Sequence, residues 1–182
     1  QGTWSPVARV VDALDAAFYA AFGAVQPTGK RVMLALDVSG SMSARVLGLE
    51  GLSCRDASAA MALVTAATEP HHRFVGFTAG SGPSRWAGLG SGLTELAISP
   101  RQRLDDVVRA IDALPMGGTD CALPMTEALQ HRWPVDLFVV YTDNETWAGP
   151  VHPAQALRRY RERMGIAARL VVVGMASNGF TI

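Results

Sequence analysis

The sequence predicts an α/β fold, an open, doubly wound, mostly parallel sheet with helices on both faces, and three observations lead to this class. Short apolar runs suited to buried strands alternate with longer stretches whose apolar residues recur at helical spacing. The apolar run at 31–38 is too short for a confident helix but suits a strand that is covered on both faces, as in a parallel sheet. A chain of 182 residues has room for one sizeable core. We therefore expect one domain over 1–182.

The first expected element is a helix over 6–23 that precedes the first strand. Ser5 and Pro6 have the residue types of an N-cap and a first helical residue. Apolar residues then recur at helical spacing: Val7, Val10, Val11, Leu14, Phe18, Ala21 and Phe22. Such a face must be buried, so we expect the helix to pack on this domain and to link it to a neighbouring one.

The remaining elements follow in alternation. A buried strand is expected over 31–38, and a Gly- and Ser-rich segment over 79–100 is expected to be a loop that leads to a short antiparallel edge strand near 94–98. Further helices are expected near 55–68, 101–113, 121–131 and 154–164, and further strands near 73–78, 135–142 and 168–175.

Charge and cysteine content exclude several classes of protein. Sixteen basic residues balance sixteen acidic ones, so no global field favours nucleic acid or an anionic membrane, and any RNA binding must be local. Cys54 and Cys121 stand alone, which favours reduced thiols and a cytoplasmic location over disulfides or zinc. No apolar run approaches about 20 residues and no signal-peptide pattern is present, so we expect no membrane association. A chain that starts at Gln1 is expected to be a processed piece.

Three polar loops are placed where an open α/β sheet forms its ligand sites, after strand ends. The first is Asp37-Val38-Ser39-Gly40-Ser41, the second is Gly117-Gly118-Thr119-Asp120, and the third is Thr142-Asp143-Asn144-Glu145. These loops offer hard oxygen ligands, which favour Mg²⁺, with Mn²⁺ or Ca²⁺ as alternatives, over zinc or copper. Each loop alone is more typical of a turn or a helix cap, and only the three together indicate a metal site.

In this combination the chain resembles the von Willebrand factor A domain with its metal-ion-dependent adhesion site. That family combines an Asp-x-Ser-x-Ser loop with a Thr and an Asp from two further loops. Carried over by position, the resemblance implies five metal ligands: Asp37, Ser39, Ser41, Thr119 and Asp143.

Longer segments, among them "VQPTGKR" before "LALDVSGSM", "PMGGTDCALPM" and "VVVGMASNGFTI", resemble the corresponding domain of the sixty-kilodalton Ro autoantigen family and its bacterial relatives, the TROVE-module proteins. Nothing is carried over onto 79–92, which is longer than the family pattern. The resemblance implies a ring of helical repeats elsewhere in the full protein, which binds Y RNA and the single-stranded ends of misfolded RNAs. The N-terminal helix would link this domain to that ring, and RNA affinity of this chain without the ring should be weak.

The implied function is metal-dependent binding without catalysis. Neutral hydroxyls from Ser39, Ser41 and Thr119, with at most two carboxylates, leave the cation able to take an acidic group from a partner. The alternative is a Mg²⁺-dependent hydrolase or phosphoryl-transfer enzyme, but the haloacid-dehalogenase type of site requires a second carboxylate where Ser39 stands. The segment "GAVQPTGKR" also lacks the glycine spacing of a phosphate-binding loop.

Other polar residues near these loops have simpler explanations. Glu145 is expected to be a loop residue, His152 to cap a helix that starts at Pro153, and Cys121 to be a small packed residue. The arginines around Tyr160, a residue expected to face the core, form the densest basic stretch: Arg158, Arg159, Arg161 and Arg163. A solvated helix face is expected for them, with an RNA-backbone contact as the alternative.

Overall fold

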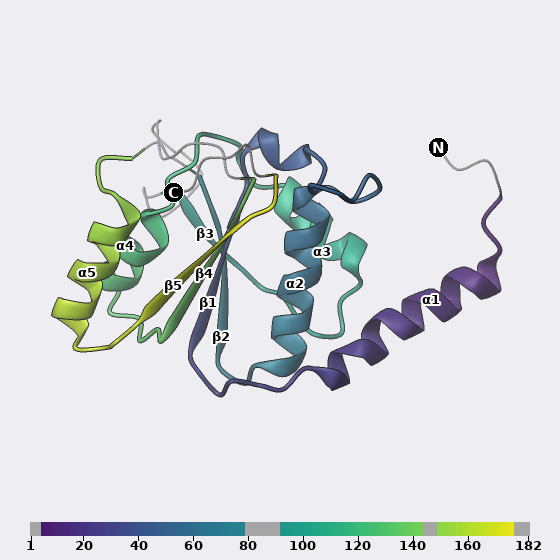
Figure 1. The fold of residues 1–182 in the computed structure, drawn as a ribbon, viewed down its shortest axis with the longest axis horizontal. Helices are drawn as coiled ribbons and strands as arrows, with labels where there is room; N and C mark the ends of the chain where they lie inside the picture. Colours follow the sequence, from purple (N-terminus) through teal and green to yellow (C-terminus); the bar gives the residue numbers. More distant parts are fainter. Residues whose placement is uncertain (1–4, 79–91, 144–148, 177–182) are drawn as a thin grey trace.

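The computed structural model describes residues 5–78, 92–143 and 149–176. Figure 1 shows a central sheet with α4 and α5 on one face and α2 and α3 on the other, which confirms the α/β class. In chain order the elements are α1 (Ala8–Ala20), η1 (Ala21–Ala24), β1 (Val32–Asp37), η2 (Gly40–Ser43), α2 (Cys54–Thr68), β2 (His72–Phe77), β3 (Leu93–Leu96), α3 (Leu104–Asp112), α4 (Leu123–Gln130), β4 (Leu137–Thr142), α5 (Pro153–Met164) and β5 (Arg169–Gly174).

The sheet has the strand order β3-β2-β1-β4-β5. β1 pairs in parallel with both β2 and β4, β5 pairs in parallel with β4, and β3 is the antiparallel edge strand that the sequence predicts. From β1 the chain first builds outward through β2 and β3, and then crosses to the other side of β1 to build β4 and β5. The order therefore reverses between β1 and β4, and the carboxyl ends of these two strands are the place where such sheets bind ligands.

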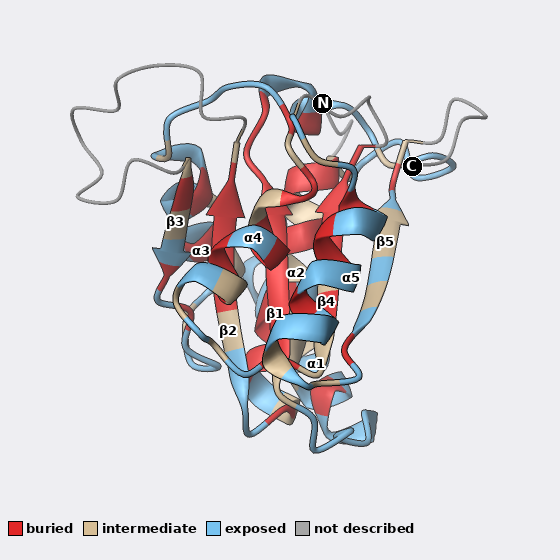
Figure 2. Cartoon of the chain, turned by 90° about the vertical axis from the view of Figure 1, so that its left-hand side faces the viewer, coloured by how far each residue is buried: buried red, intermediate tan, exposed pale blue. Residues whose placement is uncertain are grey.

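Strand β1 lies at the centre of the core, and all six of its residues are buried (Figure 2). Its alternate side chains enter two apolar clusters on opposite faces of the sheet. Val32, Leu34 and Leu36 pack with residues of α2 and α3, whereas Met33 and Ala35 pack with residues of α4 and α5. Burial on both faces explains why this strand reads as a continuous apolar run.

The ends of several elements differ from the predicted bounds by one to three residues. The helix expected over 101–113 begins at Leu104, because Ser99 to Gln102 form a turn in which the Gln102 amide donates to the Ser99 carbonyl. The helix expected over 121–131 begins at Leu123, because the Asp120 carboxylate first accepts the Ala122 amide. Of the segment over 79–100 that was predicted to be a loop and an edge strand, residues 79–91 lie outside the described residues.

The N-terminal helix differs most from its prediction. Ser5 and Pro6 were expected to start it, but α1 begins at Ala8 after Val7, which is extended and makes no side-chain capping bond. The helix tightens into η1 after Ala20. Its first turn gains little from packing, since Val7 and Val10 are about half exposed, and an isolated helix end of this kind is only marginally stable.

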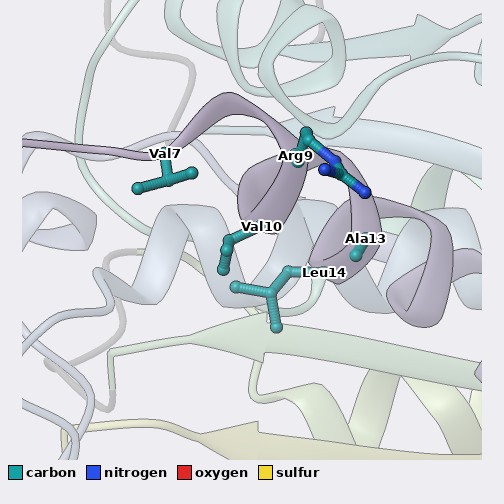
Figure 3. Close-up of a pocket in the computed structure, with 5 residues that line it drawn as sticks. All are labelled: Val7, Arg9, Val10, Ala13 and Leu14. Atoms are coloured by element: carbon teal, nitrogen blue, oxygen red, sulfur yellow. The ribbon is translucent and has the colours of Figure 1, made fainter.

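The helix was expected to pack on this domain, but only the carboxyl-terminal part of α1, together with η1, does so. Phe22 is buried, and with Phe18 and Tyr19 it forms an edge-to-face aromatic cluster. The Tyr19 hydroxyl donates to the Gln102 carbonyl ahead of α3. At the other end the apolar face is open, and Figure 3 shows two of its side chains, Val10 and Leu14, next to one another.

Two further observations concern the cysteines and possible membrane-spanning helices. Both cysteines are free and buried, so Cys121 is a packed residue, as predicted. In the part of the chain that the structure describes, no helix combines the length and the apolar character needed to cross a bilayer.

The starts of β1 and β4 are joined by an ion pair. The Arg31 guanidinium donates to both carboxylate oxygens of Asp136, with N–O distances of 2.6 and 2.9 Å, and the Arg31 amide also donates to this carboxylate. These hydrogen bonds lower the pKa of Asp136 from 3.8 to about 2. The pair therefore stabilises the fold only while Asp136 is ionised.

We predict that Phe22→Ala lowers the free energy of unfolding by about 3 kcal/mol, because it leaves a cavity where α1 meets the core. Leu14→Ala, at a position that is 65% exposed, should change it by less than about 0.5 kcal/mol. Urea denaturation of both variants measures the difference. Equal losses would mean that the amino-terminal part of α1 also packs on the domain.

We further predict that Asp136→Asn lowers the melting temperature at pH 7 and that the difference from wild type disappears in acid. The folded pKa lies below the unfolded one, so the stabilisation is present above the unfolded value and is lost as the pH falls from 3.8 towards about 2. Thermal melts across this range provide the measurement, with Asp12→Asn, an exposed carboxylate on α1, as the control. A constant difference down to pH 2 would contradict the assignment.

Candidate metal-binding site

Asp37, the last residue of β1, is the residue around which the site is built. Its carboxylate is fully buried and accepts three hydrogen bonds. Oδ1 accepts the Ser39 amide at 2.8 Å, and Oδ2 accepts the hydroxyls of Thr119 at 3.0 Å and Thr142 at 2.9 Å. These donors come from the loop after β1, the loop before α4 and the end of β4. The three segments that the sequence singled out therefore meet at one carboxylate.

Burial also governs the charge of this carboxylate. Desolvation raises the pKa of Asp37 above its usual value, and the hydrogen bonds from Ser39, Thr142 and Thr119 offset this only in part. The ionised form is thus disfavoured in the protein alone. A nearby cation would stabilise the ionised form of such a buried carboxylate.

The two serines of the first loop stand next to each other. The hydroxyl oxygens of Ser39 and Ser41 are 2.9 Å apart. Ser39 is extended and buried, whereas Ser41 lies in the short helix η2 and is exposed. The pair therefore runs from the buried carboxylate of Asp37 outward to the surface.

Asp143 follows β4 directly and is 3% exposed. Burial raises the pKa of both thiols, those of Cys54 and Cys121, and the charge of Asp143 adds to this effect. Asp37 acts on Cys121 in the same way, and burial together with these carboxylates raises the pKa of Cys121 to about 12. Asp143 therefore lies in the same electrostatic environment as Asp37. Its neighbours Asn144 and Glu145 lie outside the described residues.

Two residues that the sequence did not predict as metal ligands support this arrangement. Thr142 holds Asp37 from β4, and Arg55 holds the first loop by donating to the Ser39 carbonyl at 3.0 Å. Arg55 is 8% exposed and also forms an ion pair with Asp112 at the end of α3, at 2.6 Å. A local signal could have drawn attention to Arg55, although it does not identify the partners: a cation in the first turn of a helix is unfavourable unless it has a partner.

The chemistry available here is that of oxygen ligands. Within residues 5–78, 92–143 and 149–176, no three side chains of the His, Cys, Asp and Glu types gather in a way that could hold a metal ion. A cation at this edge would therefore depend on the hydroxyls beside Asp37 and Asp143. Such a ligand set suits hard divalent cations.

His152 plays the local part expected of it. Its Nδ1 accepts the Ala154 amide at 3.2 Å, and Pro153 is the first residue of α5. The histidine therefore caps the helix, as predicted.

Comparison with known proteins identifies relatives of the whole chain. The RNA-binding protein RO60 of Deinococcus radiodurans is 48% identical over 183 residues, which cover 100% of this chain and 32% of the relative. The RNA-binding protein RO60 of Caenorhabditis elegans is 41% identical over 181 residues, which cover 99% of this chain and 26% of the relative. The crystal structure of the Deinococcus radiodurans RO (RSR) protein matches with a TM-score of 0.85 at 48% identity, over 100% of this chain and 34% of that one.

The chain thus spans about a third or less of the length of these relatives. A family model described as the Ro60 vWA domain matches residues 31–182, which include every strand of the sheet and all five predicted ligands. This chain belongs to the Ro60 von Willebrand factor A domain family.

Proposed function

We propose that this chain is a non-catalytic, metal-dependent ligand-binding domain in a Ro60-like RNA-binding protein. One divalent cation, Mg²⁺ in first place and Mn²⁺ or Ca²⁺ as alternatives, is held by Asp37, Ser39, Ser41, Thr119 and Asp143. The observation that supports this best is the convergence of three loops on the buried Asp37 carboxylate. Buried carboxylate and hydroxyl oxygens of this kind match the preference of hard cations.

The ligand set determines what the cation does. The hydroxyls of Ser39, Ser41 and Thr119 are neutral, so only Asp37 and Asp143 offset the double positive charge. A cation held in this way attracts a further anionic ligand. We propose that this ligand is an acidic group of a partner, which makes the cation an element of recognition.

Catalysis by a Mg²⁺-dependent hydrolase or transferase has less support. Ser39 stands where such a site needs a second carboxylate. Burial and nearby carboxylates raise the pKa of the Cys121 thiol to about 12, so this thiol stays protonated near neutral pH.

The wider role rests on the relatives, which are named as RNA-binding proteins. We propose that the full protein carries a ring of helical repeats that binds Y-like and misfolded RNAs. This domain would then recruit a partner to the bound RNA through the metal site.

We predict that isothermal titration with Mn²⁺ shows one site per chain and that Asp37→Ala abolishes it, because the central carboxylate is lost. Thr142→Val should weaken binding by about 10- to 100-fold, as is usual for residues that orient a ligand. Asp12→Ala is the control and should bind as wild type does. Undiminished binding by Asp37→Ala would falsify the proposal.

We also predict that Asp37→Asn raises the melting temperature at pH 7 in EDTA. Burial gives Asp37 a higher pKa in the folded chain than in the unfolded one, so wild-type stability falls as the pH rises through this range. Asn removes that dependence. Added Mn²⁺ should stabilise wild type but not the variant. A lower melting temperature for Asp37→Asn in EDTA would show that the hydrogen bonds outweigh the effect of burial.

A further inference from the structure

Helix α5 presents three arginines on one exposed side. Its apolar residues Ala156, Leu157 and Tyr160 face the core and are buried, which turns the opposite side outward, as the sequence predicts. The exposed side carries Gln155, Arg158, Arg159, Glu162 and Arg163. We call Arg158, Arg159 and Arg163 the arginine surface.

The arginine surface lacks the acidic partners found elsewhere on the protein. On α3, Arg109 pairs with Asp105 and Asp106, and just before that helix Arg103 pairs with Asp15 and Asp105. Across the described ranges, by contrast, no carboxylate lies within ion-pair distance of Arg158, Arg159 or Arg163. The single acid on this side of α5, Glu162, forms no ion pair with them among these residues. The positive charge of the surface is therefore not neutralised locally.

The arginine surface is a local excess of positive charge on one side of the sheet. α5 packs against α4 on the face of the sheet opposite α2 and α3 (Figure 1). Four of the sixteen basic residues stand at 158–163, although the chain as a whole has no net charge. Such a local excess attracts a polyanion where the whole molecule does not.

We propose that the arginine surface binds the phosphate backbone of single-stranded RNA. Arginine presents a planar fork of donors that suits phosphate oxygens. Three such groups on one helix suit an RNA strand, which has a negatively charged phosphate at every nucleotide.

The composition of this side of α5 distinguishes between partners. A protein interface needs an apolar centre, but the exposed side of α5 is polar, which favours a polyelectrolyte over an acidic protein. Tyr160 is fully buried, and its hydroxyl donates to the Trp133 carbonyl, so this tyrosine cannot stack on a base. The contact should therefore be independent of base sequence.

The test is fluorescence anisotropy of the full chain with a labelled oligouridine of 20 nucleotides, in EDTA so that the proposed metal site plays no part. Three phosphate contacts predict a slope of about −2 in log affinity against log salt, which is a loss of about 20-fold between 50 and 200 mM salt. The triple variant Arg158→Gln, Arg159→Gln, Arg163→Gln should bind at least about 10-fold more weakly at 50 mM and lose most of that slope.

The control is Arg9→Gln, Arg45→Gln, Arg101→Gln, which removes the same charge from exposed arginines outside α5. It should retain most of the affinity, and both variants should melt as wild type does. Equal weakening by the control would overturn the proposal, because net charge alone would then explain binding. Absence of binding by wild type at 50 mM salt, or equal competition by polyglutamate, would overturn it too. These outcomes are separate from the manganese titration, so either proposal can fail without the other.

Discussion

The hydrogen bonds to the Asp37 carboxylate connect the three segments that contain the predicted metal ligands. Burying an ionised carboxylate costs several kcal/mol unless donors surround it. Here the donors are the Ser39 amide and the hydroxyls of Thr119 and Thr142. Because each donor belongs to a different segment, the carboxylate sets the relative positions of the first loop, the loop before α4 and the end of β4. The arrangement depends on all three at once.

The sheet makes this arrangement rigid. β1 is buried on both faces and bonded in register to β2 and β4, so its last residue has little freedom to move. Arg55 adds a second restraint on the first loop, because it joins the Ser39 carbonyl to Asp112 of α3. The Nε atom of Arg55 is buried and has no hydrogen-bond partner among the described residues. Part of the energy gained by these contacts is offset by that unpaired donor.

Sequence patterns were informative wherever a local rule decides the structure. The apolar run of β1 and the loop residues Asp37, Ser39 and Ser41 follow from alternation and strand ends. The edge strand β3 was predicted because a Gly- and Ser-rich segment interrupts the alternation of strands and helices. Thr142 was named in the third loop but was not predicted to contact Asp37, because a threonine at the end of an apolar strand looks like any packed β-branched residue. Arg55 was missed because its contacts depend on how α2 meets α3 and the loop, which no local pattern encodes.

The N-terminal helix shows the converse. Its apolar spacing correctly predicts a helix, but amphipathicity does not state which surface will cover the apolar face. Phe22 is buried in the core of this domain, whereas Leu14 is exposed. The predicted starts of α3 and α4 were also misplaced, because single hydrogen bonds at Ser99 and Asp120 decide where these helices begin.

The aromatic attachment of α1 has a mechanical consequence. Thirteen helical residues rise about 20 Å, and the helix is held at one end by Phe18, Tyr19 and Phe22. The aromatic cluster therefore sets the direction in which α1 leaves the domain. A domain that binds the amino-terminal part of α1 would have its orientation relative to the sheet set by this cluster.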